Sequence, residues 1–539
     1  MTNQIAKAFS LQGEPTQRFA LLFLLGLSCF IVFARYHTYD EPVEHDITTA
    51  AVIANEIREG RSYYSDLWEI KPPGWFAGHV IAQSLFGYGP GSLYALNVGL
   101  AVITLFGVYL AGSSGGGSRI AGLWAAVFWT LTSGDLNLQA NQSNTEAFMN
   151  PPLICAFALL LRARRSEKGS YILRTLLIGV LLALPTFCKP QSVFYALFLC
   201  VAHLIYPPER TASGRKQALK EVLIIASVGA AAWIAFFTYY AMTGRFQIVY
   251  TTMFIYPSYY AGSVFTNVLK SLGSALYPTQ LHFTAPLVFL TLVGGIVAWL
   301  KRSGRPWALL IAYALATQLT IGIAGKFYSH YYQLWLPLFA VGAGWSIVLL
   351  GHIIKESYAT WMPHAFAVIA LVFMLQAEIW VYAMDPEQWS VRSYGGLYVP
   401  SGILARELNN VLQPGETLYV LGDEPGFYFI TRRRPAPGVF FLTPLTGGPL
   451  AQELTTRVVN DLQRQPPDLV IILANAIGPK TTGPDDARLG PDHPLRKWIS
   501  QNYCQAVPDE RAFFRLCARP GSELEKRPSY HELLANIAP

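Results

Sequence analysis

The residues best suited to chemistry lie in a polar loop between the first two long apolar segments. The loop contains His45-Asp46 and Asp66, and it ends in the sequence Lys-Pro-Pro-Gly, which begins at Lys71. A carboxylate within hydrogen-bond reach of a hydroxyl group can remove its proton, and a lysine can hold a phosphate. We therefore expect this loop to carry out acid–base chemistry on a lipid-bound substrate.

A second group of candidate residues lies in three other polar segments. The segment 133–146 supplies Gln139 and Glu146 and contains no basic residue. Lys189 stands between two apolar segments, and a lysine there is costly unless it reaches the interface or binds an anion. We favour anion binding for Lys189. His330-Tyr331, in an aromatic turn, completes this group of candidates for substrate binding.

Each candidate also has a purely structural interpretation. Asp40 and Glu41 stand at the start of the first polar loop, and acidic loop residues are often only solvated. The tyrosines around Tyr331 fit an interfacial aromatic belt, and a structural role for His330 is favoured over a catalytic one. Lys71 fits a simple turn, since a proline forces its predecessor into an extended conformation.

Composition limits the class of protein. The chain has 539 residues, of which 52% are hydrophobic and only 14% are charged, about half the usual share of a soluble domain. The net charge is +7, but the basic residues are spread over short loops without interleaved aromatic residues. This distribution argues against a nucleic-acid partner. We expect a polytopic α-helical membrane protein.

Eleven apolar segments are long enough to approach the roughly 20 residues that cross a bilayer. They are residues 19–34, 92–112, 120–133, 147–162, 171–187, 190–206, 221–243, 285–300, 306–325, 334–354 and 363–384. The segment 75–86 is apolar but shorter, and we expect an interfacial helix there.

The distribution of basic residues orients these spans. With the N-terminus in the cytoplasm, sixteen Lys and Arg residues fall in inner loops and seven in a longer total stretch of outer loops. This is the asymmetry of the positive-inside rule. An odd number of spans then places the C-terminal region outside the membrane, on the same side as all the candidate residues.

The chain is predicted to divide into a membrane domain, residues 1–384, and a C-terminal α/β domain, residues 385–539. Short apolar runs at 418–422, 426–430 and 468–473 read as buried strands, and 399–411 and 449–463 as amphipathic helices. No glycine-rich nucleotide motif follows the first strand. Cys504 and Cys517 would be able to pair in an oxidising compartment.

The polar motifs, in their order along the chain, resemble those of the C-type glycosyltransferase superfamily. The resemblance is to the bacterial branch that includes protein O-mannosyltransferases and the aminoarabinose transferase of lipid A. It rests on Asp46, a helix ending at Gly60, Tyr64-Ser-Asp66 and Lys71-Pro-Pro, followed by Asn144-Thr-Glu146, Lys189-Pro, His330-Tyr331, Leu336-Pro, Glu424–Arg434 and Pro466-Pro-Asp468. Where the family often has an arginine at the mouth of the second span, this chain has Asn97.

This resemblance implies an inverting glycosyltransferase that takes its sugar from a polyprenyl phosphate at the outer face of a bacterial inner membrane. It implies Asp46 as general base, with Asp40-Glu41 as the rival pair, and Glu146 as a group that positions the acceptor or a metal. The donor would lie near Lys71 or Lys189. No cofactor is certain. Asp46 and Glu146 offer oxygen ligands for Mg²⁺ or Mn²⁺, but two carboxylates are a small ligand set.

Two other classes of protein remain as alternatives. A transporter or lipid flippase would fit the many spans, but the sequence shows no inverted repeat and its polar residues gather at one face. A structural subunit or receptor would use the C-terminal domain as its binding module. The sequence leaves open the sugar, the acceptor (a lipid, a glycan or a protein) and the oligomeric state.

Overall fold

The computed structural model describes residues 14–163, 170–274, 283–301, 304–351, 353, 361–478, 488–506 and 513–537. The chain forms two compact units. We call the first the helical unit (residues 1–39, 93–239 and 263–385) and the second the α/β unit (residues 40–92, 240–262 and 386–539). The first polar loop therefore belongs to the same compact unit as the C-terminal region.

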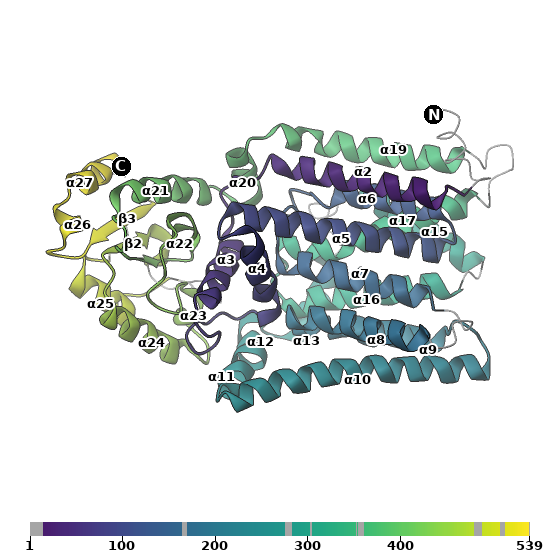
Figure 1. Ribbon diagram of the computed structural model, residues 1–539, viewed down its shortest axis with the longest axis horizontal. Helices are drawn as coiled ribbons and strands as arrows, with labels where there is room; N and C mark the ends of the chain where they lie inside the picture. The colour runs from purple at the N-terminus through teal and green to yellow at the C-terminus, as the bar shows by residue number, and fades with distance from the viewer. Residues whose placement is uncertain are drawn as a thin grey trace. The chain divides into compact units, whose positions relative to one another are not determined.

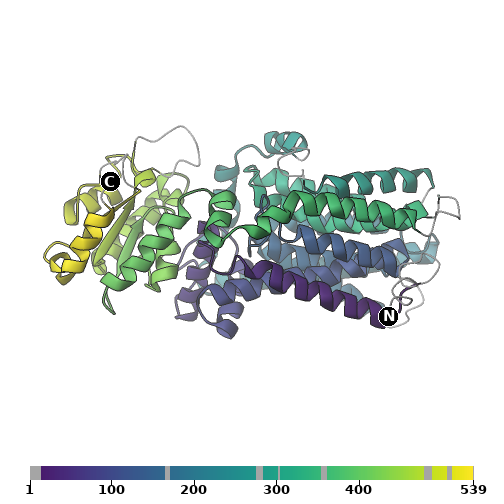
Figure 2. The ribbon, with the colours of Figure 1, turned by 90° about the horizontal axis from the view of Figure 1, so that it is seen from above.

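The helical unit is a bundle whose long helices run side by side (Figures 1 and 2). A bilayer offers the backbone no water, so apolar segments of this kind satisfy their N–H and C=O groups within each helix. In chain order the helices are α2 (Gln17–Tyr36), α5 (Pro90–Gly116), α6 (Arg119–Thr132), α7 (Thr145–Leu161), α8 (Ser170–Ala183), α9 (Val193–Ile205), α10 (Ala212–Met242), α13 (Val264–Ser274), α15 (Ala285–Leu300), α16 (Gly304–Ala324), α17 (Leu336–Gly351) and α19 (Met362–Glu378).

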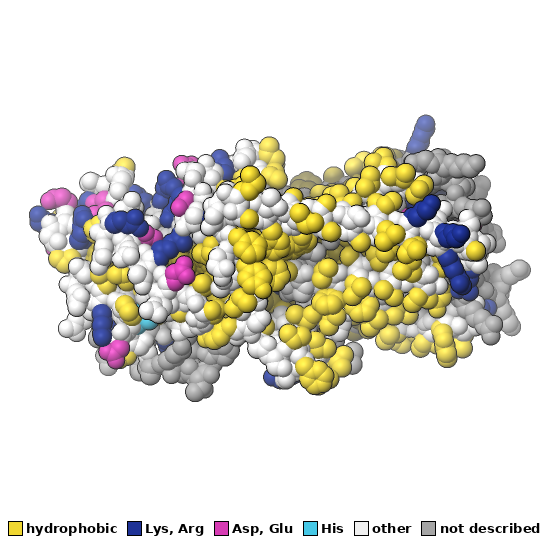
Figure 3. Space-filling view, turned by 90° about the horizontal axis from the view of Figure 1, so that it is seen from below, with side chains coloured by type: hydrophobic (Ala, Val, Ile, Leu, Met, Phe, Trp, Pro, Cys, Tyr) yellow, Lys and Arg dark blue, Asp and Glu magenta, His cyan; other side chains and the backbone are white. Residues whose placement is uncertain are grey.

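The bundle has the features of a multi-pass membrane protein. Within the described residues, six helical segments are long and apolar enough to cross a bilayer: α2, α5, α10, α16, Ser329–Gly351 and Met362–Ala383. Hydrophobic side chains cover much of the visible surface of this unit (Figure 3). The other five expected spans coincide with shorter apolar helices, so the count of eleven stays a prediction.

Small residues let three helices of the bundle approach closely. A Cβ atom on Gly112 of α5 would lie 2.9 Å from Cα of Gly122 in α6, and one on Gly344 of α17 would lie 2.5 Å from the carbonyl oxygen of Ala121. Trp345 fills the space beside them and donates from Nε1 to the carbonyl of Gly112 at 2.9 Å. Close backbone packing of this kind stabilises helix pairs where no hydrophobic driving force exists.

The α/β unit combines the first polar loop with the C-terminal region. The loop contributes α3 (His45–Arg58) and α4 (Pro73–Phe86), and the segment after α10 contributes α11 (Phe246–Tyr250) and α12 (Tyr256–Ala261). The C-terminal helices are α20 (Pro386–Tyr394), α21 (Tyr398–Val411), α22 (Gly426–Thr431), α23 (Thr443–Thr446), α24 (Ala451–Arg464), α25 (Pro494–Asn502), α26 (Glu523–Lys526) and α27 (Pro528–Ile537).

A three-stranded sheet forms the centre of the C-terminal region. Its strands are β1 (Leu418–Leu421), β2 (Leu469–Leu473) and β3 (Phe514–Ala518), in the order β1-β2-β3. β1 and β2 are parallel, whereas β2 and β3 are antiparallel. Every residue of β1 and β2 is buried, which explains why both strands read as continuous apolar runs.

The structure confirms most of the elements expected in this region and corrects one. The strands expected at 418–422 and 468–473 and the helices expected at 399–411 and 449–463 are present. The strand expected at 426–430 was wrong, because these residues form α22. Pro425 is its N-cap, and the Glu424 side chain accepts from the Gly426 N–H. A five-residue apolar run does not distinguish a buried strand from a helical turn.

Two further expectations have structural counterparts. The apolar segment 75–86 lies within α4, which is not among the candidate spans, and its interfacial position stays a prediction. Cys504 and Cys517 form a disulfide with their Cα atoms 5.8 Å apart. The strand β3, which carries Cys517, was not expected from the sequence.

Candidate active site

The first polar loop brings a carboxylate and an ammonium group into direct contact. Asp46 lies in the first turn of α3, where the helix dipole favours a negative charge. Its Oδ1 atom is 2.7 Å from Nζ of Lys71, which also lies over the Trp75 ring, 4.3 Å from the centroid. The predicted base and the predicted phosphate-binding lysine are therefore an ion pair in the α/β unit.

The two prolines after Lys71 fix the position of this lysine. Pro72 is the N-cap of α4 and Pro73 is its first residue, so the backbone before them is extended. The Lys71 N–H donates to Oε2 of Glu69 at 2.7 Å, and the hydroxyl of Tyr63 donates to the Lys71 carbonyl at 2.6 Å. Hydrogen bonds therefore hold both the N–H and the carbonyl group of Lys71.

The charge state of this pair follows from its surroundings. Burial alone would lower the pKa of Lys71, but the carboxylates of Asp46 and Glu69 outweigh burial and raise it, so the ammonium persists at neutral pH. Burial also raises the pKa of Glu69, against the opposing effect of Lys71. A persistent cation beside the first turn of α3 is the feature that a phosphate site requires.

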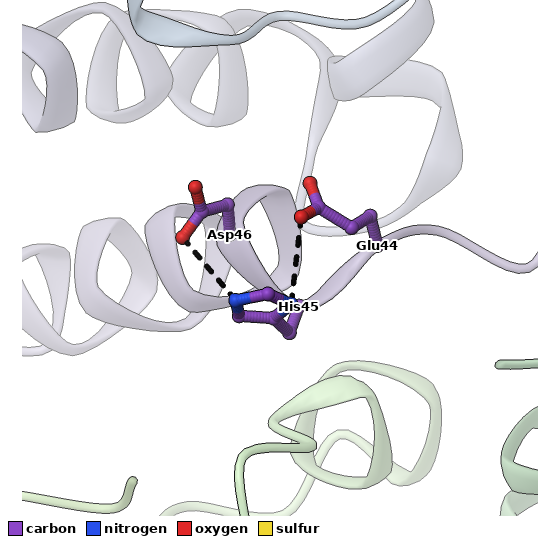
Figure 4. A group of neighbouring side chains, drawn as sticks. All are labelled: Glu44, His45 and Asp46. Atoms are coloured by element: carbon purple, nitrogen blue, oxygen red, sulfur yellow. Dashed lines mark ion pairs between the residues drawn. The ribbon is translucent and has the colours of Figure 1, made fainter. Parts of the chain in front are cut away.

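His45 places its imidazole ring beside Asp46 (Figure 4). Its Nε2 atom is 3.6 Å from Oδ1 of Asp46, and its Nδ1 atom is 3.4 Å from Oε1 of Glu44. Nδ1 also forms a 2.8 Å hydrogen bond with the hydroxyl of Tyr398. Burial lowers the pKa of His45, but the carboxylates of Glu44, Asp46 and Asp423 outweigh it, and the net pKa is raised.

The loop that follows β1 contributes another carboxyl group near His45. Glu424 is only 1% exposed, and its Oε2 atom receives no hydrogen bond within the described part of the chain. Burial raises the pKa of Glu424 to about 8, while His45 acts in the opposite direction. Glu424 and Asp423 directly follow a strand of a parallel pair, the edge at which α/β proteins often place functional groups.

The remaining candidates of the first loop have other surroundings. Asp66 accepts the N–H of Ser62 through Oδ2 at 2.7 Å and so stabilises the turn before Lys71. Asp40 is exposed, and the charge of Glu41 acts on Tyr394. Of the rival bases, Asp46 is the one that the structure places against Lys71.

A second carboxylate–lysine pair lies in the helical unit. Glu146, in the first turn of α7, is fully buried and forms an ion pair with Lys189. The Lys189 ammonium lies 3.5 Å from the centroid of the Tyr331 ring. Oε2 of Glu146 is buried and receives no hydrogen bond in the described residues. Glu146, Lys189 and Tyr331, which lie far apart in the sequence, are thus brought together.

Gln139 and His330 belong to the same region of the helical unit. Gln139 has φ of 52°, a left-handed conformation that is strained for a residue with a side chain. Its Oε1 atom is 3.2 Å from Nδ1 of His330, and Gln333 donates to the carbonyls of Leu138 and Gln139 at 2.9 and 3.0 Å. These contacts join the loop 133–144 to the segment Ser329–Trp335.

An arginine that the sequence did not point to lies beside this loop. Arg35, in the last turn of α2, donates hydrogen bonds to Oδ1 of Asn97 and to the carbonyl of Ser133. It lines a small cavity with Asn150. Nearby, burial raises the pKa of the loop residue Asp135 to about 7. The arginine that contacts Asn97 therefore comes from the first span. Asn97 itself stands at the position of the second span where the resemblance led us to expect an arginine.

The pairing with lysines bears on whether a metal fits. Glu44, His45 and Asp46 offer ligand atoms within 4.8 Å of one another, a spacing that a metal ion could use. However, the Lys71 ammonium already neutralises Asp46, and Lys189 neutralises Glu146. A divalent cation at Asp46 or Glu146 would have to displace the lysine that pairs with it, and we derive no metal-dependent step.

The sequence did not identify three residues around His45 and Lys71 as parts of the site. Tyr398 and Glu424 lie more than 350 residues from His45, and only the tertiary structure brings them together. Trp75, which packs on Lys71, follows the Lys-Pro-Pro-Gly sequence directly. A tryptophan four residues after a lysine at a helix start was the one local signal available for it.

Comparisons with solved structures identify similar folds. ArnT from Cupriavidus metallidurans bound to undecaprenyl phosphate matches 94% of this chain and 99% of its own, with a TM-score of 0.56 and 14% identity. The oligosaccharyltransferase of Archaeoglobus fulgidus in the apo form covers 85% of this chain with a TM-score of 0.53 and 12% identity. That match spans 70% of the oligosaccharyltransferase chain.

A third solved structure is AglB from Archaeoglobus fulgidus in complex with an inhibitory peptide and a dolichol-phosphate. It covers 85% of this chain and 69% of its own, with a TM-score of 0.50 and 13% identity. No family model and no curated protein matches this sequence. At such low identities the similarity concerns the fold, and it confirms the expected C-type fold class.

Proposed function

We propose that this protein, a membrane protein with the C-type glycosyltransferase fold, transfers a sugar from a polyprenyl phosphate to an acceptor hydroxyl group. The observation that carries the proposal is the Asp46–Lys71 ion pair, at 2.7 Å, in the first turn of α3. It combines a carboxylate base and a cation for the leaving phosphate within one loop. Two of the similar structures contain a polyprenyl phosphate, which supports this class of donor.

The proposed reaction is a single displacement with inversion. The acceptor hydroxyl gives its proton to the Asp46 carboxylate while its oxygen attacks the anomeric carbon. The bond between this carbon and the phosphate oxygen breaks, and the electron pair leaves with the lipid phosphate. The Lys71 ammonium stabilises the charge that develops on that phosphate. One carbon–oxygen bond forms and one breaks, on opposite faces of the sugar.

The Glu146–Lys189 pair supplies a second set of substrate contacts in this proposal. Lys189 is oriented by Tyr331, and Glu146 positions the acceptor. Gln139 and His330 support these contacts through their own contact with each other. Asp66 supports the Asp46–Lys71 pair by stabilising the turn before Lys71. The transferred group is a hexose or a pentose, and the acceptor is a lipid, a glycan or a protein.

We place the reaction at the outer face of a bacterial inner membrane. The N-terminus would be cytoplasmic, and residues 385–539 would form an extracytoplasmic domain. The Cys504–Cys517 disulfide supports this orientation, because disulfides persist in oxidising compartments. The excess of basic residues in the predicted inner loops supports it independently.

The test uses purified full-length protein in lipid with a panel of radiolabelled polyprenyl-phosphate sugars. Asp46→Asn keeps the size of the side chain but removes the base, and we expect turnover to fall by at least about 10²-fold while the protein stays folded. The release of lipid phosphate is measured. Asp492→Asn, at an exposed carboxylate paired with Lys497, is the matched control.

Two outcomes would contradict the proposal. Full turnover by Asp46→Asn would remove Asp46 as the base. Movement of intact donor across the membrane by the unaltered protein, without consumption of any sugar on the panel, would instead indicate a lipid transporter.

A further inference from the structure

The geometry points to a role for the C-terminal region in catalysis: we propose that Tyr398 is a positioning residue that holds His45 against Asp46. The inference deepens the proposed function and rests on it. It concerns residues of the α/β unit alone, since α3, β1, α21 and α22 all belong to that unit.

The first step is that His45 and Asp46 are neighbours in sequence, yet their side chains meet. Residues i and i+1 of a helix point in different directions and do not normally face each other. Here Nε2 of His45 is 3.6 Å from Oδ1 of Asp46 (Figure 4). The imidazole is therefore turned toward the first turn of its own helix, an orientation that a contact from outside α3 can hold.

The second step is that Tyr398, at the start of α21, provides that interaction. Its hydroxyl forms a 2.8 Å hydrogen bond with Nδ1 of His45. The two rings also stack, with 10° between their planes and 6.4 Å between their centroids. Burial raises the pKa of Tyr398 well above its ordinary value, so the hydroxyl keeps its proton. A hydrogen bond and a stacked ring together fix both the tilt and the rotation of the imidazole.

The third step is that the imidazole lies between two carboxyl groups of the same loop. Nε2 of His45 is 3.6 Å from Oδ1 of Asp46, and Nδ1 is 3.4 Å from Oε1 of Glu44. The hydrogen bond from Tyr398 at Nδ1 therefore decides how closely Nε2 approaches Asp46.

The consequence is that two nitrogen groups lie against the same oxygen of the base. Oδ1 of Asp46 contacts Nζ of Lys71 at 2.7 Å and Nε2 of His45 at 3.6 Å. Together they fix the plane of the carboxylate relative to α3. A base must be held within hydrogen-bond reach of its proton, and small displacements are costly to the rate. The C-terminal region would thus contribute to kcat without contacting the reacting atoms.

The test measures kcat and KM for a donor that the unaltered protein consumes. Tyr398→Phe keeps the ring and removes only the hydroxyl, and we expect kcat to fall about fivefold to tenfold with the donor KM unchanged, as for one lost hydrogen bond. Tyr503→Phe is the matched control, because that hydroxyl donates to the Pro467 carbonyl in the same unit at 2.7 Å. It should leave both constants unaltered.

A double-mutant cycle separates positioning through His45 from a general structural role. His45→Gln should also lower kcat, and adding Tyr398→Phe to it should produce no further loss, because the two residues act as one unit. Multiplicative losses in the double variant, or a normal kcat in Tyr398→Phe, would overturn the inference and leave the proposed function intact. If the unaltered protein consumes no donor, the proposed function itself fails, and this inference fails with it.

Discussion

At the scale of single residues, the proposed chemistry depends on lysines that stabilise carboxylates. Asp46 contacts Lys71, and Glu146 contacts Lys189. Each lysine also lies over an aromatic ring, Trp75 in one case and Tyr331 in the other. An aromatic face restricts the ammonium group without neutralising it. Both cations therefore remain able to bind an anion when the carboxylate exchanges partners.

Lys71 offers the sharpest test of donor binding at this scale. Lys71→Met keeps the length of the side chain and its packing on Trp75 but removes the charge. We expect kcat/KM for the donor to fall about 100-fold, since a charged group that stabilises a developing phosphate is worth roughly 3 kcal/mol. Lys270→Met, at an exposed lysine of α13, is the control. An unchanged kcat/KM in Lys71→Met would exclude phosphate binding by this residue.

Glu424 gives a prediction about pH and stability. Its folded-state pKa is about 8, above the ordinary carboxyl value of 4.5, so the folded protein favours the protonated form. Its stabilising contribution is complete below pH 4.5 and is lost as the pH rises through 8. Glu424→Gln removes this titration. We expect its melting temperature, relative to the unaltered protein, to rise between pH 5 and pH 9, and a constant difference would refute the burial argument.

At the scale of elements, buried ionic contacts tie several helices together at the end of the bundle opposite the Glu146–Lys189 pair. Glu221 of α10 accepts from Arg174 of α8 at 3.0 Å and pairs with His203 of α9 at 2.8 Å. Arg305 of α16 lies 3.3 Å from the other ring nitrogen of His203. It also donates to the carbonyl of Leu160, at the C-terminus of α7, at 2.7 Å. Five helices thus share one buried network.

Removing the central carboxylate should destabilise the bundle. Glu221→Gln leaves Arg174 buried without its counter-charge, and breaking a buried pair costs about 3–5 kcal/mol. We expect a clearly lower melting temperature in detergent and no change in KM for the donor. Glu523→Gln is the control, at a carboxylate whose side chain is 84% exposed. Equal melting temperatures for the two variants would show that the network contributes nothing to stability.

At the scale of the whole molecule, the chain consists of two compact units. The helical unit exposes apolar side chains, and only 6% of the residues in the most apolar stretch of α10 are buried inside the protein. The α/β unit has a buried sheet and a disulfide. The first polar loop is grouped with the C-terminal region and not with the helices that flank it in sequence. His45 and Tyr398 accordingly lie in the same unit, where they form a hydrogen bond.

The disulfide tests the proposed orientation of the molecule. The protein is denatured directly from cells and treated with a thiol reagent. Without reductant the reagent should label four cysteines, and after reduction it should label six, because Cys504 and Cys517 are bonded. Removing both by substitution with serine should lower the stability of the α/β unit by about 3 kcal/mol. Labelling of six cysteines without reduction would place the C-terminal region in a reducing compartment.

The sequence alone determined the class of fold and the identity of the ion-paired residues. Apolar segments of nearly bilayer length specify helices, since no other single segment satisfies its backbone in lipid, and each of the eleven expected segments contains a helix among the described residues. Asp46 and Lys71 were also recognisable, because residue types and proline geometry are local properties. The prediction of a strand at 426–430 was wrong, because five apolar residues show too little periodicity to distinguish a strand from a helix.

Only the tertiary structure decided which residues surround the charges. Tyr398, Glu424 and Arg35 reach their partners across long separations in sequence, and no local pattern encodes those distances. The pairing of Asp46 with Lys71 and of Glu146 with Lys189 was likewise visible only in the structure. The type of an element follows from short-range periodicity in the sequence. The surroundings of a buried charge follow instead from the packing of elements that lie far apart in the sequence.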